Sequence, residues 1–299
     1  MASQFDKSFS DVYKAVYENS KQHIGVFSGE MAEIKKSLSE GLGHPNFTDM
    51  KYGEIIPGSI IVFFMDIRGF TKISIALDNE ELIRILQATT IASIYSVRKF
   101  GGYIIEYTGD GIMAYFGDGI KTNSRDAFNS LRAATYLMEG IKNNVNSYLS
   151  RNGDETIRVG MGLEYGNTLW TQIGTPDACQ PKPVSEVTFI AGKNSSHAKP
   201  WEVIIGKNIA EWVPEGFKDT YKAYEFQKDN EKYSYKRFLF KWQEFNKQFN
   251  ANRQQTEYTF LKKNLPALGT TIMSNTDTVI NTSNTATKGP RPLKDQPFF

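Results

Sequence analysis

Residues 58–71 read GSIIVFFMDIRGFT, and this stretch decides the fold of the chain. The run from Ser59 to Met65 is short, apolar and rich in β-branched and aromatic side chains, which predicts a buried strand. Asp66 stands at the carboxyl end of this strand, and a turn with Gly69 follows at once. The sequence therefore predicts a carboxylate placed where a buried strand ends.

The segments that follow alternate between helical and strand patterns. Amphipathic periodicity predicts helices over 79–99 and 124–149. Strands are predicted over 103–107, 111–116, 156–163, 168–173, 186–191, 202–205, 221–226 and 233–240, with a turn at 165–167. This β-α-β-β-α-β-β order predicts an α+β, ferredoxin-like fold in which helices cover a mainly antiparallel sheet.

The two ends of the chain differ from this centre. Residues 5–40 carry apolar side chains at roughly helical spacing, so we expect an N-terminal helical extension over 1–50, used for packing or a dimer contact. Seven threonines lie between Thr270 and Thr287, and three prolines follow them. That composition lacks the apolar density to fold alone. We therefore expect a central domain with a C-terminal strand extension over 51–265 and a disordered tail over 266–299.

Composition excludes several classes of function. The chain has 35 Lys and Arg against 33 Asp and Glu, and a net charge of +2 argues against nucleic acid or an anionic membrane as the main partner. The longest apolar run is too short to span a membrane, and the first ten residues lack a signal-peptide core, so we expect a cytoplasmic protein. With Cys179 as the only cysteine and three histidines, any catalytic metal must rest mainly on oxygen ligands.

Two aspartates stand out by their positions. Asp66 ends the first strand, and Asp110 lies at the tip of the predicted hairpin with Thr108 and Gly109. In the predicted order both can lie at one edge of the sheet, where two carboxylates repel unless a cation sits between them. Mg²⁺ or Mn²⁺ fits such oxygen ligands, and two metals about 3.5–4 Å apart suit displacement at phosphorus. The N–H groups of residues 67–71, at a helix start, suit a phosphate. The simpler alternative is that each aspartate only caps a turn or helix.

Three segments in order carry a resemblance to a known family: IVFFMDIRGFT (61–71), GGYIIEYTGDGIMAYFG (101–117) and RVGMGLEYGNTLWTQIG (158–174). Together, over about residues 58–206, they resemble the catalytic domain of the class III nucleotidyl cyclases. The resemblance implies that Asp66 and Asp110 bind two Mg²⁺ or Mn²⁺ ions, with the carbonyl of Ile67 as a further ligand. It also implies that the ribose 3′-hydroxyl of a nucleoside triphosphate attacks the α-phosphorus. The residues that would hold the triphosphate are Ile67, Arg68, Gly69, Phe70 and Thr71.

The resemblance places base recognition four residues before the hairpin aspartate, at Glu106. In the family a lysine there goes with adenine and a glutamate with guanine. A carboxylate accepts hydrogen bonds, so it suits the N–H groups of guanine, uracil or cytosine better than adenine. Thr188 could meet a uracil carbonyl, and Lys182, expected in a loop, stands where the family often has a basic triphosphate contact. The alternatives are a solvated Glu106 in a cross-strand pair and a solvated loop lysine.

Residues 189–200 depart from the family pattern. The family has a helix that carries an Asn and, four residues later, an Arg, whereas here Pro200 shortens the helix and no Arg is present. Asn194 or Ser196 stands for the Asn, and Lys199, or less favourably Lys193, stands for the Arg. Alternatively, 192–199 is only a connecting loop. The family also implies a homodimer in which Glu106 and Lys199 face the metal-binding aspartates of the partner.

Taken together, these features resemble the pyrimidine cyclases of bacterial anti-phage systems (Pycsar). That likeness implies a homodimeric enzyme that makes cyclic UMP or cyclic CMP, which activates a separate effector protein. The fit of the uracil N3–H to Glu106 places UTP narrowly ahead of CTP. A diguanylate cyclase is disfavoured, because Tyr103-Ile104-Ile105 rather than acidic residues follow the glycine pair 101–102. The remaining alternatives are an adenylate or guanylate cyclase, a catalytically dead nucleotide-binding dimer, favoured by the missing Arg, and a purely structural dimer module.

Overall fold

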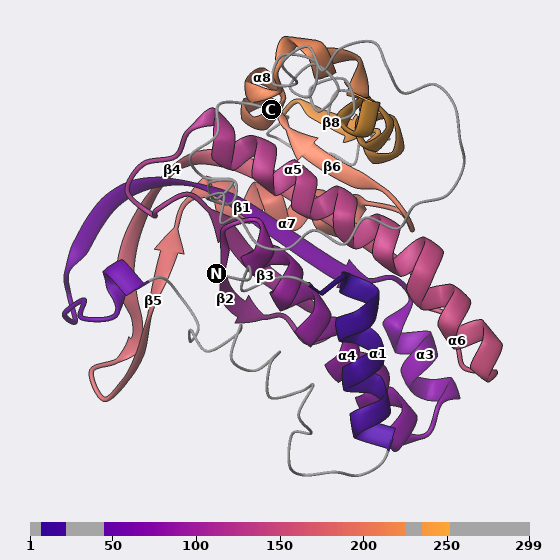
Figure 1. Cartoon of the computed structure of the whole chain (residues 1–299). Coiled ribbons are helices and arrows are strands. Elements are labelled where there is room, and N and C mark those ends of the chain that lie inside the picture. Colours follow the sequence, from indigo (N-terminus) through magenta and orange to yellow (C-terminus); the bar gives the residue numbers. More distant parts are fainter. Residues whose placement is uncertain (1–6, 22–44, 225–234, 252–299) are drawn as a thin grey trace, which may run out of the picture. The chain divides into compact units, whose positions relative to one another are not determined.

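A computed structural model describes residues 7–21, 45–224 and 235–251 (Figure 1). The chain divides into two units, Met1–Phe245 and Asn246–Phe299, and the described part of the second, residues 246–251, is helical. The predicted tail over 266–299, the domain boundary at 265 and most of the predicted N-terminal helix lie outside the described residues.

Among the described residues, eight strands form one sheet. Its order is β2-β3-β1-β4-β6-β8-β7, and β5 pairs with β4 off this path. All neighbours are antiparallel except β4 and β6, which are parallel. The predicted mainly antiparallel α+β fold is therefore confirmed. The strands are β1 (Ile55–Ile67), β2 (Gly102–Tyr107), β3 (Gly111–Phe116), β4 (Val159–Thr175), β5 (Ala178–Val184), β6 (Val203–Gly206), β7 (Tyr221–Ala223) and β8 (Arg237–Phe240).

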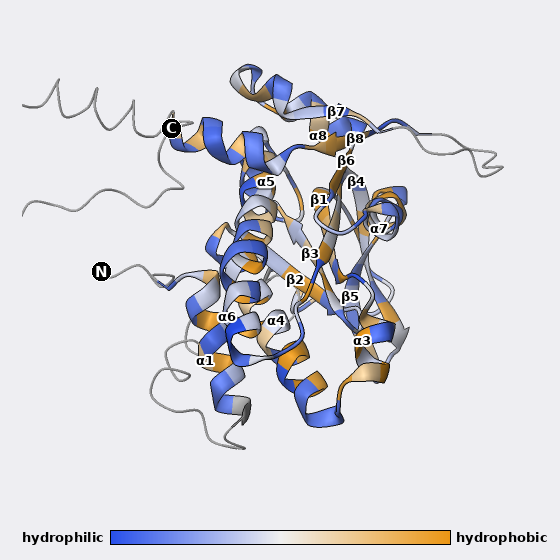
Figure 2. Cartoon of the chain, turned by 90° about the vertical axis from the view of Figure 1, so that its right-hand side faces the viewer, coloured by the Kyte–Doolittle hydropathy of each residue, from blue (hydrophilic) through white to orange (hydrophobic). Residues whose placement is uncertain are grey.

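Helices lie on both faces of this sheet, which Figure 2 shows edge-on. On one face are α4 (Asn79–Lys99) and α5 (Ser124–Glu139), and α1 (Phe9–Lys21) packs on α4. On the other face α7 (Glu186–His197) packs against β4 and β1. The predicted helix over 124–149 continues from α5 through a π-helical turn, η2 (Gly140–Val145), into α6 (Asn146–Asn152). The shorter elements are η1 (Pro45–Phe47), α3 (Phe70–Ala76), α8 (Lys207–Trp212) and η3 (Glu215–Thr220).

Local signals in the sequence explain where the long helices begin. The side chain of Asp78 accepts a hydrogen bond from the Glu81 N–H at 2.8 Å and so caps α4. Asn123 and Asp126 form a reciprocal capping box at the start of α5. In α1, Phe9, Val12 and Val16 are buried, as the helical spacing predicts. These ends depend on residues within one helical turn of each other, which is why sequence reasoning places them well.

Strand β1 lies inside the sheet, between β3 and β4. Along its whole length it pairs with β4, and from Ile61 to Asp66 it also pairs with β3. One of its faces packs into a cluster in which the Phe47 and Trp170 rings stack at 4.1 Å between centroids. A strand bonded on both edges and buried on both faces gives Asp66 a rigid support. The buried members of this cluster are Phe47, Met50, Ile60, Val62, Ile105, Met113, Tyr115, Trp170, Val187 and Ala191.

Three sequence predictions about this region are wrong. The expected turn at 165–167 is absent, because β4 pairs with β1 without a break and Gly166 lies opposite Ile60. Residues 186–191 form the first half of α7 rather than a strand, since Val187 and Ala191, four apart, pack on the sheet together. Lys182 lies in strand β5 rather than in a loop, where the neighbouring prolines are tolerated at a sheet edge.

The packing of α7 on β4 depends on Gly162. A Cβ atom there would lie 2.0 Å from the backbone nitrogen of Ser195 and 2.4 Å from the carbonyl oxygen of Ala191. We expect Gly162→Ala to lower the free energy of unfolding by about 1–3 kcal/mol, because the helix backbone must move. Gly192→Ala is the matched control, since its Cβ would meet the Phe64 ring at an ordinary 3.6 Å. That variant should be neutral or stabilised by up to about 1 kcal/mol. Urea unfolding of both variants checks this, and equal stabilities would contradict it.

Candidate active site

Asp66 and Asp110 lie side by side at one edge of the sheet, as expected. Asp66 lies opposite Gly111 in the β1–β3 pair, and the Ile67 N–H donates to the Asp110 carbonyl oxygen at 3.4 Å. A Cβ atom on Gly111 would come 2.2 Å from the Asp66 Oδ1, so the glycine leaves room for the carboxylate. Antiparallel pairing of β1 with the β2–β3 hairpin therefore brings together two aspartates that are 44 positions apart.

The charges at this edge favour a hard cation. Burial raises the pKa of Asp110 and the neighbouring Asp66 raises it further, while Arg68 lowers it. Among the described residues, no group of three or more His, Cys, Asp or Glu side chains comes together. The oxygen atoms that this strand end offers are those of the two carboxylates and of the Ile67 carbonyl. This donor set fits Mg²⁺ or Mn²⁺ and does not suit a soft metal.

The loop after β1 leads directly into a helix. The Arg68 N–H donates to the Arg158 carbonyl at 2.6 Å, and Gly69 adopts φ 77° as the N-cap of α3, which begins at Phe70. This left-handed conformation favours glycine at position 69. The first N–H groups of a helix have no intrahelical partner. The predicted helix start beside the aspartates is confirmed, and it places Phe70 and Thr71 at the turn expected to hold phosphates.

The two residues expected at the base and the triphosphate contact each other. Lys182 Nζ lies 2.7 Å from Glu106 Oε2, and this ion pair joins β5 to β2, which are not neighbours in the sheet. The Glu106 side chain is half-exposed, whereas that of Lys182 is mostly covered. Thr188 lies in the first turn of α7 and donates to the Pro183 carbonyl at 3.5 Å. Sequence reasoning missed the pairing, because 76 residues separate its members.

Helix α7 corrects two expectations for residues 192–199. Residues 192–197 are helical, so they are not merely a connecting loop, and the helix ends at His197, three residues before Pro200. Asn194 is 0% exposed and its amide donates to the Leu163 carbonyl at 3.2 Å. A side chain that is fully buried does not reach a substrate, so the burial of Asn194 disagrees with its expected role in holding the ribose. Ser196, the other candidate, is exposed.

Lys199 is exposed on a tight turn that follows α7. Glu202 N–H donates to the Lys199 carbonyl at 3.0 Å, and Trp201 adopts φ 70°, a conformation that a non-glycine residue rarely takes. The Trp242 indole N–H donates to the Trp201 carbonyl at 3.1 Å, and Lys142 lies over both tryptophan rings. Surrounding contacts therefore hold a strained turn that presents Lys199 to the outside.

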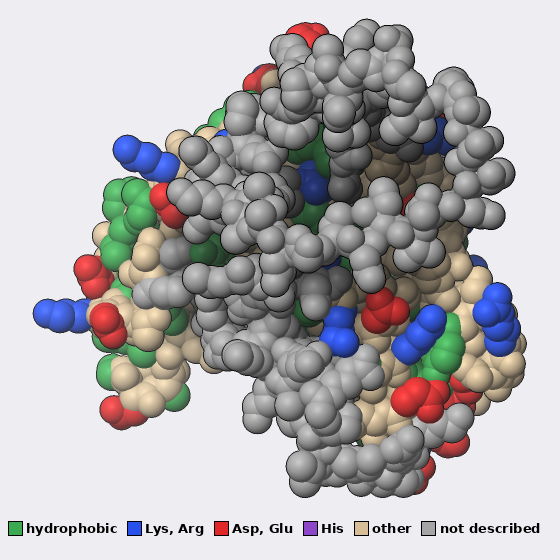
Figure 3. Space-filling model, in the orientation of Figure 1, with side chains coloured by type: hydrophobic (Ala, Val, Ile, Leu, Met, Phe, Trp, Pro, Cys, Tyr) green, Lys and Arg blue, Asp and Glu red, His purple; other side chains and the backbone are tan. Residues whose placement is uncertain are grey.

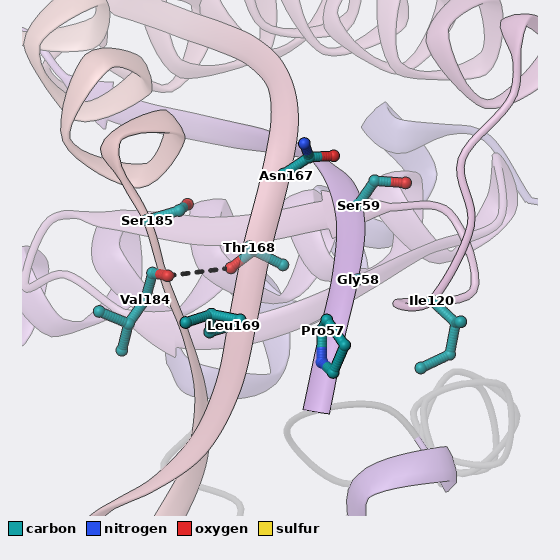
Figure 4. A pocket seen from close by; sticks show the side chains of 9 residues that line it. All are labelled: Pro57, Gly58, Ser59, Ile120, Asn167, Thr168, Leu169, Val184 and Ser185. Atoms are coloured by element: carbon teal, nitrogen blue, oxygen red, sulfur yellow. Dashed lines mark hydrogen bonds between the residues drawn. The ribbon is translucent and has the colours of Figure 1, made fainter. Parts of the chain in front are cut away.

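A cavity of about 500 Å³ lies away from the aspartates (Figure 4). Its wall includes the first part of β1, where Ser59 faces Asn167 of β4, seven residues before Asp66. At strand spacing that is roughly 23 Å. The cavity is therefore separate from the site at the aspartates. Its lining residues are Pro57, Gly58, Ser59, Ile120, Asn167, Thr168, Leu169, Val184 and Ser185.

The described surface does not gather charge of one sign on the face seen in Figure 3, where Lys and Arg lie beside Asp and Glu. This agrees with the net charge of +2. Within the described ranges, none of the helices has the length and apolar character needed to cross a bilayer.

A third carboxylate, Glu164 of β4, is buried away from this edge. It is 3% exposed and accepts hydrogen bonds from the N–H groups of Tyr165, Asn208 and Ile209, the last two at the start of α8. A Cβ on Gly206 would collide with its Oε2. Burial raises the pKa of Glu164 to about 7, against the lowering effect of these hydrogen bonds.

This raised pKa predicts a pH-dependent stability. The folded chain binds the Glu164 proton more tightly than the unfolded chain does, so the contribution is complete below about pH 4.5 and is lost as the pH rises through about 7. We expect the free energy of unfolding to fall by up to about 3 kcal/mol over that range because of this group. Glu164→Gln should lose that part of the slope. Urea unfolding from pH 4.5 to 8 checks this, and parallel curves for wild type and variant would contradict it.

Comparison with known proteins gives consistent matches. Residues 57–233 match the family model described as the adenylate and guanylate cyclase catalytic domain. A cytidylate cyclase from Escherichia coli is 23% identical over 196 residues, 62% of this chain and 42% of that protein. A cytidylate cyclase from Staphylococcus aureus is 24% identical over 215 residues, 70% of this chain and 50% of that protein. The matches thus span half or less of these curated relatives.

Solved structures share the fold around the aspartates. The adenylyl cyclase CyaB from P. aeruginosa matches with a TM-score of 0.56 at 20% identity, over 62% of this chain and 95% of that one. The guanylyl cyclase Cya2 matches with a TM-score of 0.54 at 19% identity, over 63% and 93%. At such identities the likeness is one of fold.

Proposed function

This chain belongs to the family of adenylate and guanylate cyclase catalytic domains, and from that premise we propose that it cyclises a pyrimidine nucleoside triphosphate, CTP or UTP. The products are the 3′,5′-cyclic monophosphate and pyrophosphate. The observation that carries the catalytic part is the juxtaposition of Asp66 and Asp110 beside the start of α3.

In this proposal the chain's own residues bind and orient the nucleotide. Asp66, Asp110 and the Ile67 carbonyl hold two Mg²⁺ or Mn²⁺ ions, and N–H groups at Gly69–Thr71 orient the triphosphate. When bound, the metals supply a lowered pKa at the ribose 3′-hydroxyl and neutralise charge on the phosphates. The 3′-hydroxyl gives up its proton to water and its oxygen forms a bond to the α-phosphorus. The bond from the α-phosphorus to the oxygen that bridges to the β-phosphate breaks, and pyrophosphate carries that electron pair away.

The ion pair between Glu106 and Lys182 is compatible with a pyrimidine base but does not by itself distinguish pyrimidines from purines. It presents one acceptor and one donor together. Uracil can give its N3–H to the carboxylate and take the ammonium hydrogen bond on a carbonyl, and cytosine can give its amine and take it on N3 or O2. The sequence argument favours UTP, whereas the names of the two curated relatives favour CTP. Guanine remains the rival base, because its N1–H and O6 also suit such a pair.

We propose a homodimer with two shared sites. An apolar face of the arm made by β1, β4 and β5 is exposed, and Leu169 pairs with Val184 across it. A second copy of the chain can cover this face and bring Glu106 and Lys199, together with Ser196, to the aspartates of its partner. The exposed apolar residues of the arm are Ile55, Leu169, Ile173 and Val184.

A second candidate is a nucleotide-binding domain without catalysis. Helix α7 carries no arginine, so the transition-state charge would rest on a lysine, either Lys199 after the helix or, less favourably, Lys193 within it. One experiment separates the two. Purified full chain is incubated with Mn²⁺ and, separately, with ATP, GTP, CTP and UTP, and products are identified by mass spectrometry. Cyclic CMP or cyclic UMP above the purine products supports the proposal. Dominant cyclic GMP or cyclic AMP contradicts the pyrimidine part, and nucleotide binding without product supports the inactive alternative.

We extend the proposal to a second-messenger role in anti-phage defence, with a separate effector protein that binds the cyclic product. Its support is the resemblance to the Pycsar cyclases. Plaque counts on cells that carry the wild-type chain or Asp66→Asn, with the neighbouring genes intact, test this role. Equal plaque counts would contradict it.

A further inference from the structure

The side chain of Arg68 points into the fold of its own chain, between β4 and the end of α7. Its guanidinium lies over Gly160 of β4, where a Cβ atom would come 2.3 Å from Nε and 2.7 Å from Nη2. Burial lowers the pKa of Arg68, while Asp66 and Asp110 raise it. The glycine in the third family motif therefore makes the space in which this cation sits.

From that space Arg68 binds the last turn of α7. Its Nη2 donates to the Ser195 carbonyl at 2.5 Å and to the Ser195 Oγ at 3.2 Å. The Ser195 carbonyl also accepts a hydrogen bond from the Ala198 N–H at 3.0 Å, and a cation at this end of the helix is favoured by the helix dipole. Arg68 thus attaches the carboxyl end of α7 to the loop that follows β1.

Ser195 links Arg68 to Asp66. It is fully buried, and its Oγ donates to Asp66 Oδ2 at a long 3.4 Å. Asp66, Ser195 and Arg68 therefore form one contiguous set of polar contacts between β1 and α7. Residues 195 and 66 are 129 positions apart, and only the folded chain brings them together.

We propose that Arg68 and Ser195 are positioning residues that couple the metal site to helix α7. This inference rests on the proposed function, in which α7 and the turn after it present Ser196 and Lys199 to the partner's site. A cation bound by Asp66 competes with Ser195 for Oδ2 and repels the Arg68 guanidinium, so metal binding loosens the end of α7. In a homodimer, metal binding at one site would then change the positions of Ser196 and Lys199, which contribute to the other site.

The attachment itself is tested on the metal-free full chain by hydrogen–deuterium exchange of residues 191–198. Arg68→Ala should speed exchange there by about tenfold, the effect of losing a charged hydrogen bond. Arg68→Lys should not restore slow exchange, because a lysine keeps the charge but lacks the planar fork that reaches Ser195. Arg158→Ala is the matched control, since that nearby side chain is exposed. Unchanged exchange in Arg68→Ala, or full rescue by lysine, would overturn the attachment.

The coupling is tested by adding Mn²⁺ alone, with binding followed in parallel by calorimetry. In the wild type, Mn²⁺ should speed exchange over 191–198 at least about twofold. Ser195→Ala should bind Mn²⁺ yet show a smaller response than the wild type, because it loses the contact with Asp66 Oδ2 but keeps the Arg68 contact with the carbonyl of residue 195. If Mn²⁺ binds but α7 does not respond, or if Ser195→Ala responds as the wild type does, the coupling is overturned while the proposed function stands. If Mn²⁺ does not bind the wild type, the proposed two-metal function fails and the coupling fails with it.

Discussion

Asp66→Asn and Asp110→Asn should each lower the cyclisation rate at least about a thousandfold while the fold is retained. A metal that stabilises transition-state charge is worth several kcal/mol, and about 4 kcal/mol corresponds to that factor. Asparagine keeps the shape of each side chain but removes a charged oxygen ligand. The metal-free Asp110→Asn chain should be no less stable than the wild type above neutral pH, because burial and the neighbouring Asp66 disfavour the Asp110 charge.

Two measurements check this result together. Product formation with Mn²⁺ reports the rate, and calorimetry with Mn²⁺ alone reports whether metal affinity falls with it. Asp177→Asn is the matched control, since Asp177 is exposed at the turn between β4 and β5. It should keep the wild-type rate and affinity. A variant at position 66 or 110 with wild-type turnover would remove the two-metal mechanism.

Glu106→Gln should lower kcat/KM for the preferred pyrimidine nucleotide by about 10- to 100-fold. A buried polar edge of the base would lose its charged acceptor, a cost of roughly 1–3 kcal/mol per unmatched group. Glu106→Lys should weaken pyrimidine use further, because it sets a second ammonium beside Lys182, and it should raise ATP relative to CTP and UTP. Measuring kcat/KM for all four nucleotides checks both changes.

The double variant Glu106→Lys with Lys182→Glu separates base recognition from a purely structural ion pair. The swap restores an ion pair between β2 and β5 but reverses its donor and acceptor. If Glu106 reads the base, the double variant stays poor with pyrimidines even though its stability recovers. Glu211→Gln, which breaks the exposed Lys207–Glu211 pair of 3.4 Å, is the control and should leave kcat/KM unchanged. Full recovery of pyrimidine turnover in the swap would contradict base reading by Glu106.

Several features of this chain follow from short-range patterns in the sequence alone. The ends of α4, the hairpin of β2 and β3, and the start of α3 after Gly69 all depend on residues that are neighbours in the chain. The placement of Asp66 at a strand end and of Asp110 at a hairpin tip also depends on neighbouring residues. From these patterns and the three family motifs, the fold and the two aspartates could be predicted.

Tertiary contacts set the secondary structure of two segments for which the local sequence pattern predicts another conformation. Residues 186–191 are β-branched enough to resemble a strand, but packing of one face on the sheet makes them a helix. Tyr165-Gly166-Asn167 reads as a turn, but hydrogen bonding to β1 keeps β4 continuous through these residues. Propensity differences of a few tenths of a kcal/mol per residue are small beside the burial and hydrogen bonding of a whole element.

The difference between local and tertiary contacts also explains which residues of the candidate site could be predicted from the sequence. Local backbone geometry sets which residues end β1 and form the tip of the β2–β3 hairpin, so these positions follow from neighbouring residues. Packing between distant segments pairs Lys182 with Glu106, buries Asn194 and joins α7 to Asp66 through Arg68 and Ser195. These contacts join residues from about 30 to almost 130 positions apart. Their partners are selected by how strands and helices pack, which no spacing within a single segment encodes.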